Sequence, residues 1–416
     1  MKITHVVINY FPSVGGTQIF YQGISENCVQ HFNDEVEVLT IDSYYGSHSK
    51  QYKKITPAHE TINEVVVKRF PFFRKHIKIL SLLNVLIYKI SGKFSNKLWL
   101  LCTGPWSSSL KKAIDNSTAD IISGSPSGFL YMHYPLYRHK LKNPKPFVYQ
   151  GAIHFGADNH SQVISDNTLA AIKASEFYMA NTEYEKKRLI NLGVPEDIIV
   201  VTGVGVEMQT FEKGDNEICR NDFALQADDI LIGYIGRLEK TKSIEVLINA
   251  FIKSLKQNKK LRLVIAGFES DYFKELQQFV QTLNAFEKSC IFFKTNLLKQ
   301  DKVNLFHALD IFVLPSLNES FGIVFLEAWS CKKPVIGVSI GAVASVISDR
   351  VDGLLMKPND ANDLSEKLLE LASNPELRKT FGINGFNKTV QNFTWPIVTQ
   401  KYRDTYIKAI NKFNNV

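Results

Sequence analysis

Residues 311–328 read IFVLPSLNESFGIVFLEA, and this segment is the most informative part of the chain. It begins with an apolar run closed by Pro315, which is typical of a buried strand. Its second half has apolar residues at helical spacing, and Ser320 is a natural N-cap for such a helix. The segment therefore predicts a strand, a short turn and a helix, the repeating unit of a parallel α/β sheet.

Two carboxylates of this segment, Glu319 and Glu327, have seven residues between them. A helix N-terminus presents free backbone N–H groups and about half a positive charge, which favours anions. Glu319 falls at the predicted helix start and Glu327 about two turns further along. We therefore expect a phosphate at the helix start, with Glu319 near its attached group and Glu327 bonded to a polyol. Taken alone, the spacing is more often that of a capped amphipathic helix with two solvated acids.

The composition of the 416-residue chain is that of a globular protein with more than one hydrophobic core. Hydrophobic residues make up 45% and charged residues 22%, which argues against disorder. The net charge of +8 fits nucleic acid, an acidic membrane face or small anionic substrates as partners. The five scattered cysteines predict reduced thiols in a cytoplasmic compartment. The N-terminus does not read as a signal peptide, and no apolar run is long enough for a membrane-spanning helix.

Apolar strand candidates alternate with helical segments through both halves of the chain, as in parallel sheets with helices on both faces. In the first half they are 3–8, 36–41, 65–67, 121–122, 147–149, 177–180 and 198–202; in the second half they are 230–235, 261–266, 291–293, 311–314, 334–338 and 353–356. A charged stretch at 212–222 is interpreted as an interdomain linker. We predict an α/β fold with two Rossmann-like β/α/β domains facing across a cleft. The expected boundaries are 1–210, 211–392, and a final helix at 393–416 packing back toward the first domain.

Two cations follow the predicted strand 230–235, within the sequence GRLEKTK at 236–242. Arg237 and Lys242 are five residues apart and are able to clamp a diphosphate, the arginine bidentately. A pair of solvated surface cations fits the same pattern. Two weaker signals lie at other strand exits. Gly267 allows close approach of a ligand to the backbone, and the turn from Thr295 to Leu297 suits a flat base.

The order of these motifs over about 120 residues resembles the retaining glycosyltransferases of family 4, also called group 1, which have the GT-B fold. The resemblance implies that Arg237 and Lys242 hold the diphosphate of a nucleotide-sugar donor. It implies that Glu319 contacts the transferred sugar and Glu327 the ribose, while backbone amides near Gly322 hold the distal phosphate. The implied donor site comprises Gly15, Gly16, Gly236, Arg237, Lys242, Gly267, Thr295, Leu297, Glu319, Ser320, Phe321, Gly322, Ile323 and Glu327, and the implied catalytic residues are Glu319, His154, Arg237 and Lys242.

In the first half, the sequence FPSVGGTQ at 11–18 follows the first predicted strand. Its pair Gly15 and Gly16 permits a tight turn near a phosphate or an acceptor, although a plain turn is an alternative. The pattern is not G-x-G-x-x-G, which lowers the chance of a nicotinamide site. The strand 147–149 leads to His154, where the resembled family carries a histidine near the transferred sugar; a purely structural histidine is the alternative.

Residues 65–114 contain ten Lys and Arg, no Asp or Glu, and many interleaved apolar residues. A basic amphipathic stretch of this kind is able to lie on an anionic membrane. Nucleic acid is an alternative, but no nucleic-acid motif accompanies the segment. A core helix with a solvated basic face is the third interpretation. We expect contact with an anionic membrane surface and no nucleic-acid partner.

By resemblance, the function is transfer of a hexose-type sugar from a UDP- or GDP-sugar to a hydroxyl of a glycan or lipid-linked acceptor, with retention of anomeric configuration. Cell-surface polysaccharide or glycolipid synthesis at the inner face of the cytoplasmic membrane would suit such an enzyme. No D-x-D motif occurs, so we expect no metal or other cofactor, with cations stabilising the leaving diphosphate instead. Ser243 departs from the family, which usually has glycine there. A sugar-nucleotide epimerase on the same fold, or a non-catalytic membrane-associated partner of a glycan assembly complex, remains open.

Overall fold

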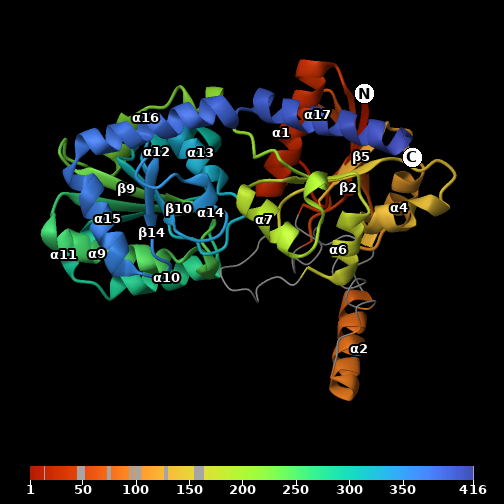
Figure 1. Ribbon diagram of the computed structural model, residues 1–416. Coiled ribbons are helices and arrows are strands. Elements are labelled where there is room, and N and C mark those ends of the chain that lie inside the picture. The colour runs from red at the N-terminus through yellow and green to blue at the C-terminus, as the bar shows by residue number, and fades with distance from the viewer. Residues whose placement is uncertain are drawn as a thin grey trace. The chain divides into compact units, whose positions relative to one another are not determined.

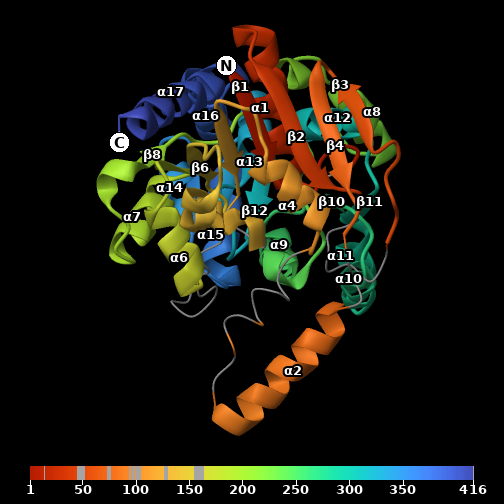
Figure 2. The ribbon, with the colours of Figure 1, turned by 90° about the vertical axis from the view of Figure 1, so that its right-hand side faces the viewer.

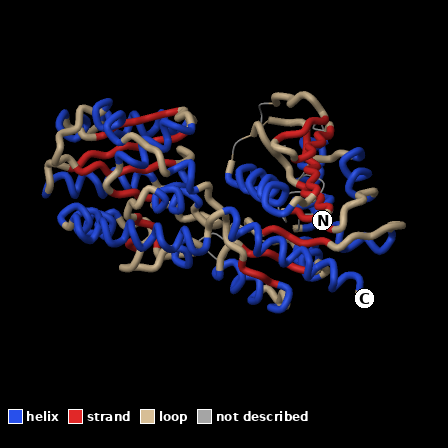
Figure 3. The backbone as a smooth tube through the Cα atoms, turned by 90° about the horizontal axis from the view of Figure 1, so that it is seen from above, coloured by secondary structure: helices blue, strands red, loops and turns tan. Residues whose placement is uncertain are grey.

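The computed structural model describes residues 1–13, 15–44, 52–72, 76–92, 95, 98, 105–125, 130–153 and 164–415. The chain forms two compact units (Figure 1). Unit 1 comprises Met1–Ile153, Val163–Gly205 and Trp395–Val416, and unit 2 contains Val206–Thr394. Each unit has a twisted sheet with helices on either side, as the strands and helices in Figure 3 show. Strands and helices alternate along the chain in both units, as the sequence predicts.

The sheet of unit 1 has the strand order β3-β4-β2-β1-β5-β6-β7-β8. All neighbouring pairs are parallel except β3 and β4, which form an antiparallel hairpin at one edge. The strands are β1 (Lys2–Val6), β2 (Glu35–Ile41), β3 (His59–Ile62), β4 (Val65–Phe70), β5 (Ile121–Gly124), β6 (Phe147–Gln150), β7 (Phe177–Ala180) and β8 (Ile199–Val201). The strand order reverses between β1 and β5, so loops that follow these two strands lie at a switch point of the topology.

Helices cover the sheet of unit 1, except that α2 stands away from it (Figures 1 and 2). They are α1 (Gly16–Phe32), α2 (His76–Ser91), α4 (Ser108–Asp115), α5 (Tyr134–Tyr137), α6 (Asp166–Lys173), α7 (Glu183–Asn191) and α17 (Trp395–Asn414). The last helix of the chain packs along α1. The aromatic side chains of Trp395, Tyr402 and Tyr406 are buried there, so α17 contributes to the core of unit 1.

The sheet of unit 2 has six parallel strands in the order β11-β10-β9-β12-β13-β14. They are β9 (Ile230–Ile235), β10 (Leu261–Gly267), β11 (Ile291–Thr295), β12 (Ile311–Leu314), β13 (Val335–Val338) and β14 (Gly353–Met356). Continuous apolar runs form these strands because both faces of the sheet are covered by helices. The order reverses between β9 and β12, as in dinucleotide-binding doubly wound sheets.

Helices pack in pairs against the faces of this second sheet. They are α8 (Asn216–Asp222), α9 (Ile244–Gln257), α10 (Asp271–Gln281), α11 (Ala285–Ser289), α12 (Lys299–Ala308), α13 (Ile323–Ser330), α14 (Val343–Val346), α15 (Ala361–Ser373) and α16 (Pro375–Asn392). The packed pairs are α9 with α15, α8 with α12, and α13 with α16. The fully buried indole of Trp329 lies between α13 and α16, where it excludes any side chain at Gly385.

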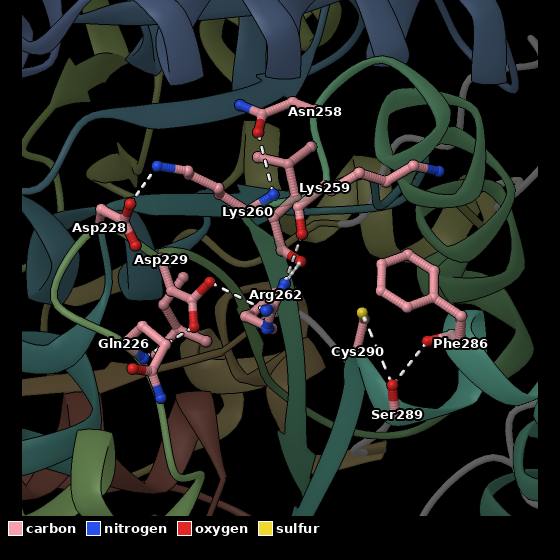
Figure 4. A network of polar contacts seen from close by, with 12 residues as sticks. Gln226, Asp228, Asp229, Asn258, Lys259, Lys260, Arg262, Phe286, Ser289 and Cys290 are labelled. Carbon is pink, nitrogen blue, oxygen red and sulfur yellow. Dashed lines mark hydrogen bonds and ion pairs between the residues drawn. The ribbon is translucent and has the colours of Figure 1, made fainter.

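Charged side chains tie together the entry to β9 and the start of β10 in unit 2 (Figure 4). Arg262 forms an ion pair with Asp229 at 3.0 Å, and Lys260 forms one with Asp228. The Asp229 carboxylate also accepts a hydrogen bond of 2.8 Å from the backbone N–H of Gln226. This network lies at the amino ends of the strands, whereas ligands of such sheets bind at the carboxyl ends. We therefore assign it to stability.

The prediction of an α/β fold with parallel sheets is confirmed, and every strand candidate corresponds to an observed strand. Two expectations are wrong. The charged stretch 212–222 is no free linker, because α8 packs on α12 and the Asp215 N–H donates to Asn304 Oδ1 at 3.0 Å. Ser320 does not cap α13; Gly322 does, with a left-handed φ of 87°. Glycine takes that conformation without steric cost, which moves the helix start two residues along.

The described residues of the basic segment 65–114 belong to separate elements and do not form one continuous surface. Lys68 and Arg69 belong to β4, where Lys68 pairs with Glu37 at 2.7 Å and the buried Arg69 donates to the Phe11 carbonyl at 2.8 Å. At the other end of the segment, α4 covers β2. Among the described residues of this segment, α2 alone exposes large apolar side chains along its length. None of the described helices combines the length and the apolar character needed to cross a bilayer.

Candidate active site

The loops after β9 and β12 are neighbours at the switch point of the unit 2 sheet, because these two strands are paired. Crossovers leave β9 and β12 in opposite directions, so no helix covers the sheet edge between their carboxyl ends. The predicted motifs with Lys242 and Glu319 follow these two strands. The topology therefore brings together two sequence segments about 80 residues apart.

Lys242 and Glu319 meet directly. The Lys242 ammonium donates to Glu319 Oε1 at 2.5 Å, and the two side chains are only 9% and 14% exposed. Lys242 ends a short 3-10 turn, Lys240–Lys242, that directs it inward. Lys240, two residues earlier, is 70% exposed and pairs with Glu275. Because of this turn, Lys242 points inward and Lys240 points into solvent. The sequence pattern does not distinguish the two lysines.

Arg237 lies at the exit of β9 but points outward. Its guanidinium is 64% exposed and donates to Glu239 Oε1 at 2.8 Å. The backbone carbonyl of Arg237 accepts a hydrogen bond of 2.7 Å from the phenol of Tyr234. Burial raises the pKa of Tyr234 well above its ordinary value, and the nearby Glu319 and Glu239 charges raise it further. The neutral phenol therefore fixes the loop beneath Arg237, a role that sequence reasoning missed.

Glycines allow the loops after β9 and β10 to touch. The Gly236 N–H donates to the Ala266 carbonyl at 3.0 Å. A Cβ atom on Gly267 would lie 2.0 Å from the carbonyl oxygen of Gly236. Because that contact is with backbone, a larger residue at 267 would push the two strand exits apart. Gly267 therefore permits close packing between two segments of the chain, and the approach of a ligand there stays a prediction.

The first turn of α13 carries no acidic residue and no side-chain cap. Its leading backbone N–H groups, beginning at Ile323, are therefore left for another acceptor. The ring of Phe321 is 2% exposed and packs edge-on against Phe393 at 5.4 Å between centroids. Phe321 thus anchors the loop through its side chain, leaving only its backbone for a ligand. The helix start lies two residues beyond the predicted one, with Glu319 three residues before the N-cap Gly322.

Glu327, on the second turn of α13, forms a partly buried ion pair with Lys302 of α12 at 2.6 Å. Its other oxygen, Oε2, is buried and has no hydrogen-bond partner among the described residues. Two atoms in the loop after β12, Ser316 Oγ and Asn318 Oδ1, are likewise buried without a hydrogen-bond partner among the described residues. Buried polar atoms are normally bonded, so unsatisfied atoms at a strand exit are candidates for ligand contacts. Lys302 is a further residue that sequence reasoning missed.

A pocket of about 190 Å³ opens next to Thr295 and Leu297, the residues expected to face a base. Its walls come from the loop after β11, from α8 and from α12; they include Ile218, Cys219, Asp222, Lys294, Asn296 and Leu305. The backbone of Asn296 is left-handed and its N–H donates to the Gly267 carbonyl at 2.9 Å. This bond fixes the pocket wall to the exit of β10, within the same unit as Lys242.

In unit 1, Gly15 is the N-cap of α1 and Gly16 its first residue, where the chain arrives from β1 at the switch point of that sheet. Neither glycine has a left-handed backbone, and a Cβ on Gly16 would meet nothing within 4 Å. The turn therefore does not require this pair for conformational reasons. His154 lies outside the described residues.

The exit of β6, which leads toward His154, is held by the buried carboxyl of Glu185. That group accepts hydrogen bonds from the Tyr178 phenol at 2.6 Å and from the N–H groups of Asn181 at 2.8 Å and Ile153 at 3.1 Å. Burial raises its pKa above the ordinary value. Glu185 thus positions the loop end at Ile153.

Within the described ranges, no group of three or more His, Cys, Asp or Glu side chains is arranged to hold a metal ion. The cysteines Cys28, Cys219, Cys290 and Cys331 are free and buried. Two ion pairs follow from the predicted site segments of unit 2: Lys242 with Glu319, and Lys302 with Glu327.

Residues 215–388 match the family profile described as glycosyl transferases group 1. D-inositol 3-phosphate glycosyltransferase of Saccharomonospora viridis is 28% identical over 262 residues, which are 61% of this chain. The alignment spans about three fifths of that relative's length, 60%. An uncharacterised glycosyltransferase of Methanocaldococcus jannaschii is 26% identical over 408 residues, 95% of both chains.

Solved structures share the fold over nearly the whole chain. The Anabaena protein HepE in complex with UDP superposes with a TM-score of 0.72 at 18% identity, covering 97% of this chain and 99% of that one. The trehalose-6-phosphate synthase OtsA superposes with a TM-score of 0.74 at 12% identity, covering 98% and 99%. These likenesses show the GT-B fold.

Proposed function

The protein has the GT-B fold, and its residues 215–388 belong to the group 1 glycosyltransferases; on that premise we propose that it transfers a hexose-type sugar from a UDP- or GDP-sugar to an acceptor hydroxyl. The acceptor we propose is a glycan or lipid-linked sugar, in cell-surface polysaccharide or glycolipid synthesis on the cytoplasmic side of a membrane. Retention of anomeric configuration, as in family 4, is part of the proposal.

The observation that carries this proposal is the Lys242–Glu319 pair at the start of α13. A buried cation beside open helix N–H groups suits the diphosphate of a donor, since both favour negative charge. The adjacent Glu319 carboxylate suits a sugar hydroxyl, and the unsatisfied Oε2 of Glu327 suits a ribose hydroxyl. The pocket beside Thr295 and Leu297 suits the base.

In the proposed reaction, the bond between the anomeric carbon and the diphosphate oxygen breaks while the acceptor oxygen bonds to that carbon. The acceptor proton goes to the departing phosphate, so no protein nucleophile is assigned. Negative charge grows on the leaving diphosphate, and Lys242, the α13 N-terminus and Arg237 after reorientation would stabilise it. These groups do the work for which other enzymes use a divalent cation, so we expect turnover to persist in EDTA.

Calorimetric titration of UDP-glucose and GDP-mannose in EDTA tests the donor site. We expect one donor to bind the wild type, and Lys242→Ala to weaken binding by about tenfold to a hundredfold, the loss of a charge-assisted contact. Lys240→Ala is the matched control, because it removes a lysine from the same turn that faces solvent. It should bind donor as the wild type does. Equal binding by all three proteins would refute the site.

Acceptor-dependent product formation then separates the proposal from its alternatives. A transferase releases nucleoside diphosphate only with acceptor present, whereas an epimerase changes the sugar nucleotide without one. Donor binding with neither reaction, over a panel of hydroxyl acceptors, would favour a non-catalytic partner. The anomeric proton coupling of the product, measured by NMR, decides between retention and inversion.

A further inference from the structure

Helix α2 carries an apolar stripe that faces solvent. Six large aliphatic residues recur at spacings of three and one, which places them on one side of a helix: Ile79, Leu82, Leu83, Leu86, Ile87 and Ile90. Their exposed fractions run from 36% at Ile87 to 86% at Ile90. An apolar stripe of this kind normally faces a protein core. Here no described helix or strand packs along it (Figures 1 and 2).

The opposite side of α2 is the side that connects to the protein. Asn84 is only 5% exposed, and its side-chain oxygen accepts a hydrogen bond of 2.7 Å from the Ser95 N–H. Asn84 lies outside the stripe by helical periodicity. The stripe is therefore left outward, while Asn84 ties another side of the helix to the chain that follows; Val85 and Tyr88, outside the stripe, are also exposed, at 44% and 47%. A row of exposed large apolar residues along one face of a helix is typical of an interaction site.

The charge around α2 indicates what covers the stripe. Helix α2 itself contains Lys78 and Lys89 and no Asp or Glu. These two positions are three helical turns apart, along the same edge of the stripe. Lysine stems lie along an apolar surface while their ammonium groups reach a polar layer. Helix partners in coiled coils use both signs of charge at such edges, whereas a surface of one sign only suits an anionic sheet of headgroups.

The length of α2 decides how it meets such a surface. Its 16 residues extend for about 24 Å, less than the roughly 30 Å of a bilayer's hydrocarbon core. A helix of this length with an apolar stripe and flanking cations lies in the plane of the interface. We propose that α2 docks unit 1 on an anionic lipid bilayer, with Leu82, Leu86 and Ile90 inserted and Lys89 among the headgroups. Only the further step, that the acceptor is lipid-linked, rests on the proposed function.

Sedimentation with vesicles tests the docking without any turnover. The vesicles are phosphatidylcholine alone, or phosphatidylcholine and phosphatidylglycerol in equal parts. We expect the wild type to sediment with the anionic vesicles, and the variant Leu82→Ser/Leu86→Ser/Ile90→Ser to bind them more than about tenfold more weakly. The replaced side chains are at least 54% exposed, so the fold should persist, as circular dichroism would verify.

A matched control is Ile383→Ser/Val390→Ser, which removes two exposed aliphatic residues from α16 in the other unit, at 39% and 41% exposure. It should sediment as the wild type does. Lys78→Glu/Lys89→Glu should lose the preference for anionic over neutral vesicles. Raising the salt concentration should weaken binding of the wild type and leave that variant nearly unaffected.

Two outcomes would overturn the proposal. In one, the triple serine variant sediments as strongly as the wild type, which would remove α2 from any membrane contact. In the other, the wild type sediments with neither vesicle and forms a dimer that the triple variant does not form, which would make the stripe a face for a second copy. Donor titration on the triple variant separates membrane docking from donor binding, because the Lys242–Glu319 pair of the proposed donor site belongs to unit 2 and α2 to unit 1.

Discussion

Lys302 is the residue that most changes the interpretation of the site. It holds one oxygen of Glu327 at 2.6 Å and leaves the other free, so the carboxylate has a fixed orientation before any ligand arrives. A carboxylate held in this way loses little conformational freedom on binding a hydroxyl. We infer that Lys302 is a positioning residue, acting on the ligand through Glu327.

Lys302→Ala should raise the donor dissociation constant by about tenfold, the cost of one charge-assisted hydrogen bond, without removing a direct ligand contact. Lys299→Ala, on the exposed first turn of the same helix, is the control and should have no effect. The discriminating readout is the nucleotide lacking both ribose hydroxyls. Its affinity should be the same for wild type and Lys302→Ala; an equal loss for both nucleotides would mean that the lysine acts on the fold instead.

Gly267→Ala tests the close packing of strand exits. The new methyl would meet the Gly236 carbonyl oxygen at 2.0 Å, which backbone cannot relieve without separating β9 and β10. We expect a loss of about 1–3 kcal/mol in the free energy of unfolding, measured by urea denaturation of the unit 2 transition. Gly16→Ala, where a Cβ meets nothing within 4 Å, should leave stability unchanged. Equal stability of both variants would contradict the packing argument.

At the scale of elements, the sequence predicts the strands whose two faces are both buried under helices. The strands of unit 2 are continuous apolar runs, so each was predictable. Strand β3 was missed because it is a polar edge strand whose side chains are largely exposed. The helix α8 was mistaken for a linker because it buries only Cys219. Elements with at most one buried residue carry little periodic signal.

The same limit applies to the site. Lys242 and Glu319 were predictable because both follow strands whose carboxyl ends share one sheet edge. Their supporting residues Lys302 and Tyr234 could not be predicted. The contact of Lys302 depends on how α12 packs against α13. The contact of Tyr234 depends on the path of the loop that follows β9. Helix-to-helix register is a property of packed side chains rather than of local pattern. The sequence thus predicts the residues at the strand exits, but only the structure identifies the side chains that hold them in place.

The start of α9 has a strained residue where the resembled family has glycine. Ser243 adopts φ 54° and makes no side-chain cap. A residue with a Cβ in this conformation costs about 1–2 kcal/mol, part of which glycine regains. Ser243→Gly should therefore raise the unfolding free energy of unit 2 by about 0.5–1 kcal/mol. Ser243→Ala keeps the Cβ and should give no gain; a matching gain in both variants would point to the hydroxyl rather than the backbone.

For the whole molecule, the path of the chain makes unit 1 depend on its last helix. The chain leaves unit 1 after Gly205 and returns at Trp395. The buried indole of Trp395 fills the space beside Gly23 and Gly205, where any side chain would collide with it. Both ends of the sequence therefore belong to one core, and unit 1 is complete only when α17 is in place.

A buried histidine makes this closure sensitive to pH. His5 of β1 bonds Ser25 of α1 at 2.7 Å and the phenol of Tyr406 of α17 at 3.1 Å. Burial lowers the pKa of His5 from 6.5 to about 3. Above pH 6.5 the imidazole is neutral in both the folded and unfolded states. Below it the unfolded chain takes up a proton that the folded protein refuses, so stability falls with pH at about 1.4 kcal/mol per unit until the folded pKa is reached.

His5→Gln isolates that contribution. The variant should be less stable than the wild type at pH 7, because it loses the imidazole bonds to Ser25 and Tyr406. From pH 7 to pH 5, however, the wild type should lose about 2 kcal/mol that the variant does not lose, so the difference between them shrinks. The unit 1 transition in urea unfolding, followed by tryptophan fluorescence, measures this. Parallel plots of unfolding free energy against pH for the two proteins would mean that His5 gains its proton in the folded state. The packing of β1, α1 and α17 would then not require a neutral imidazole.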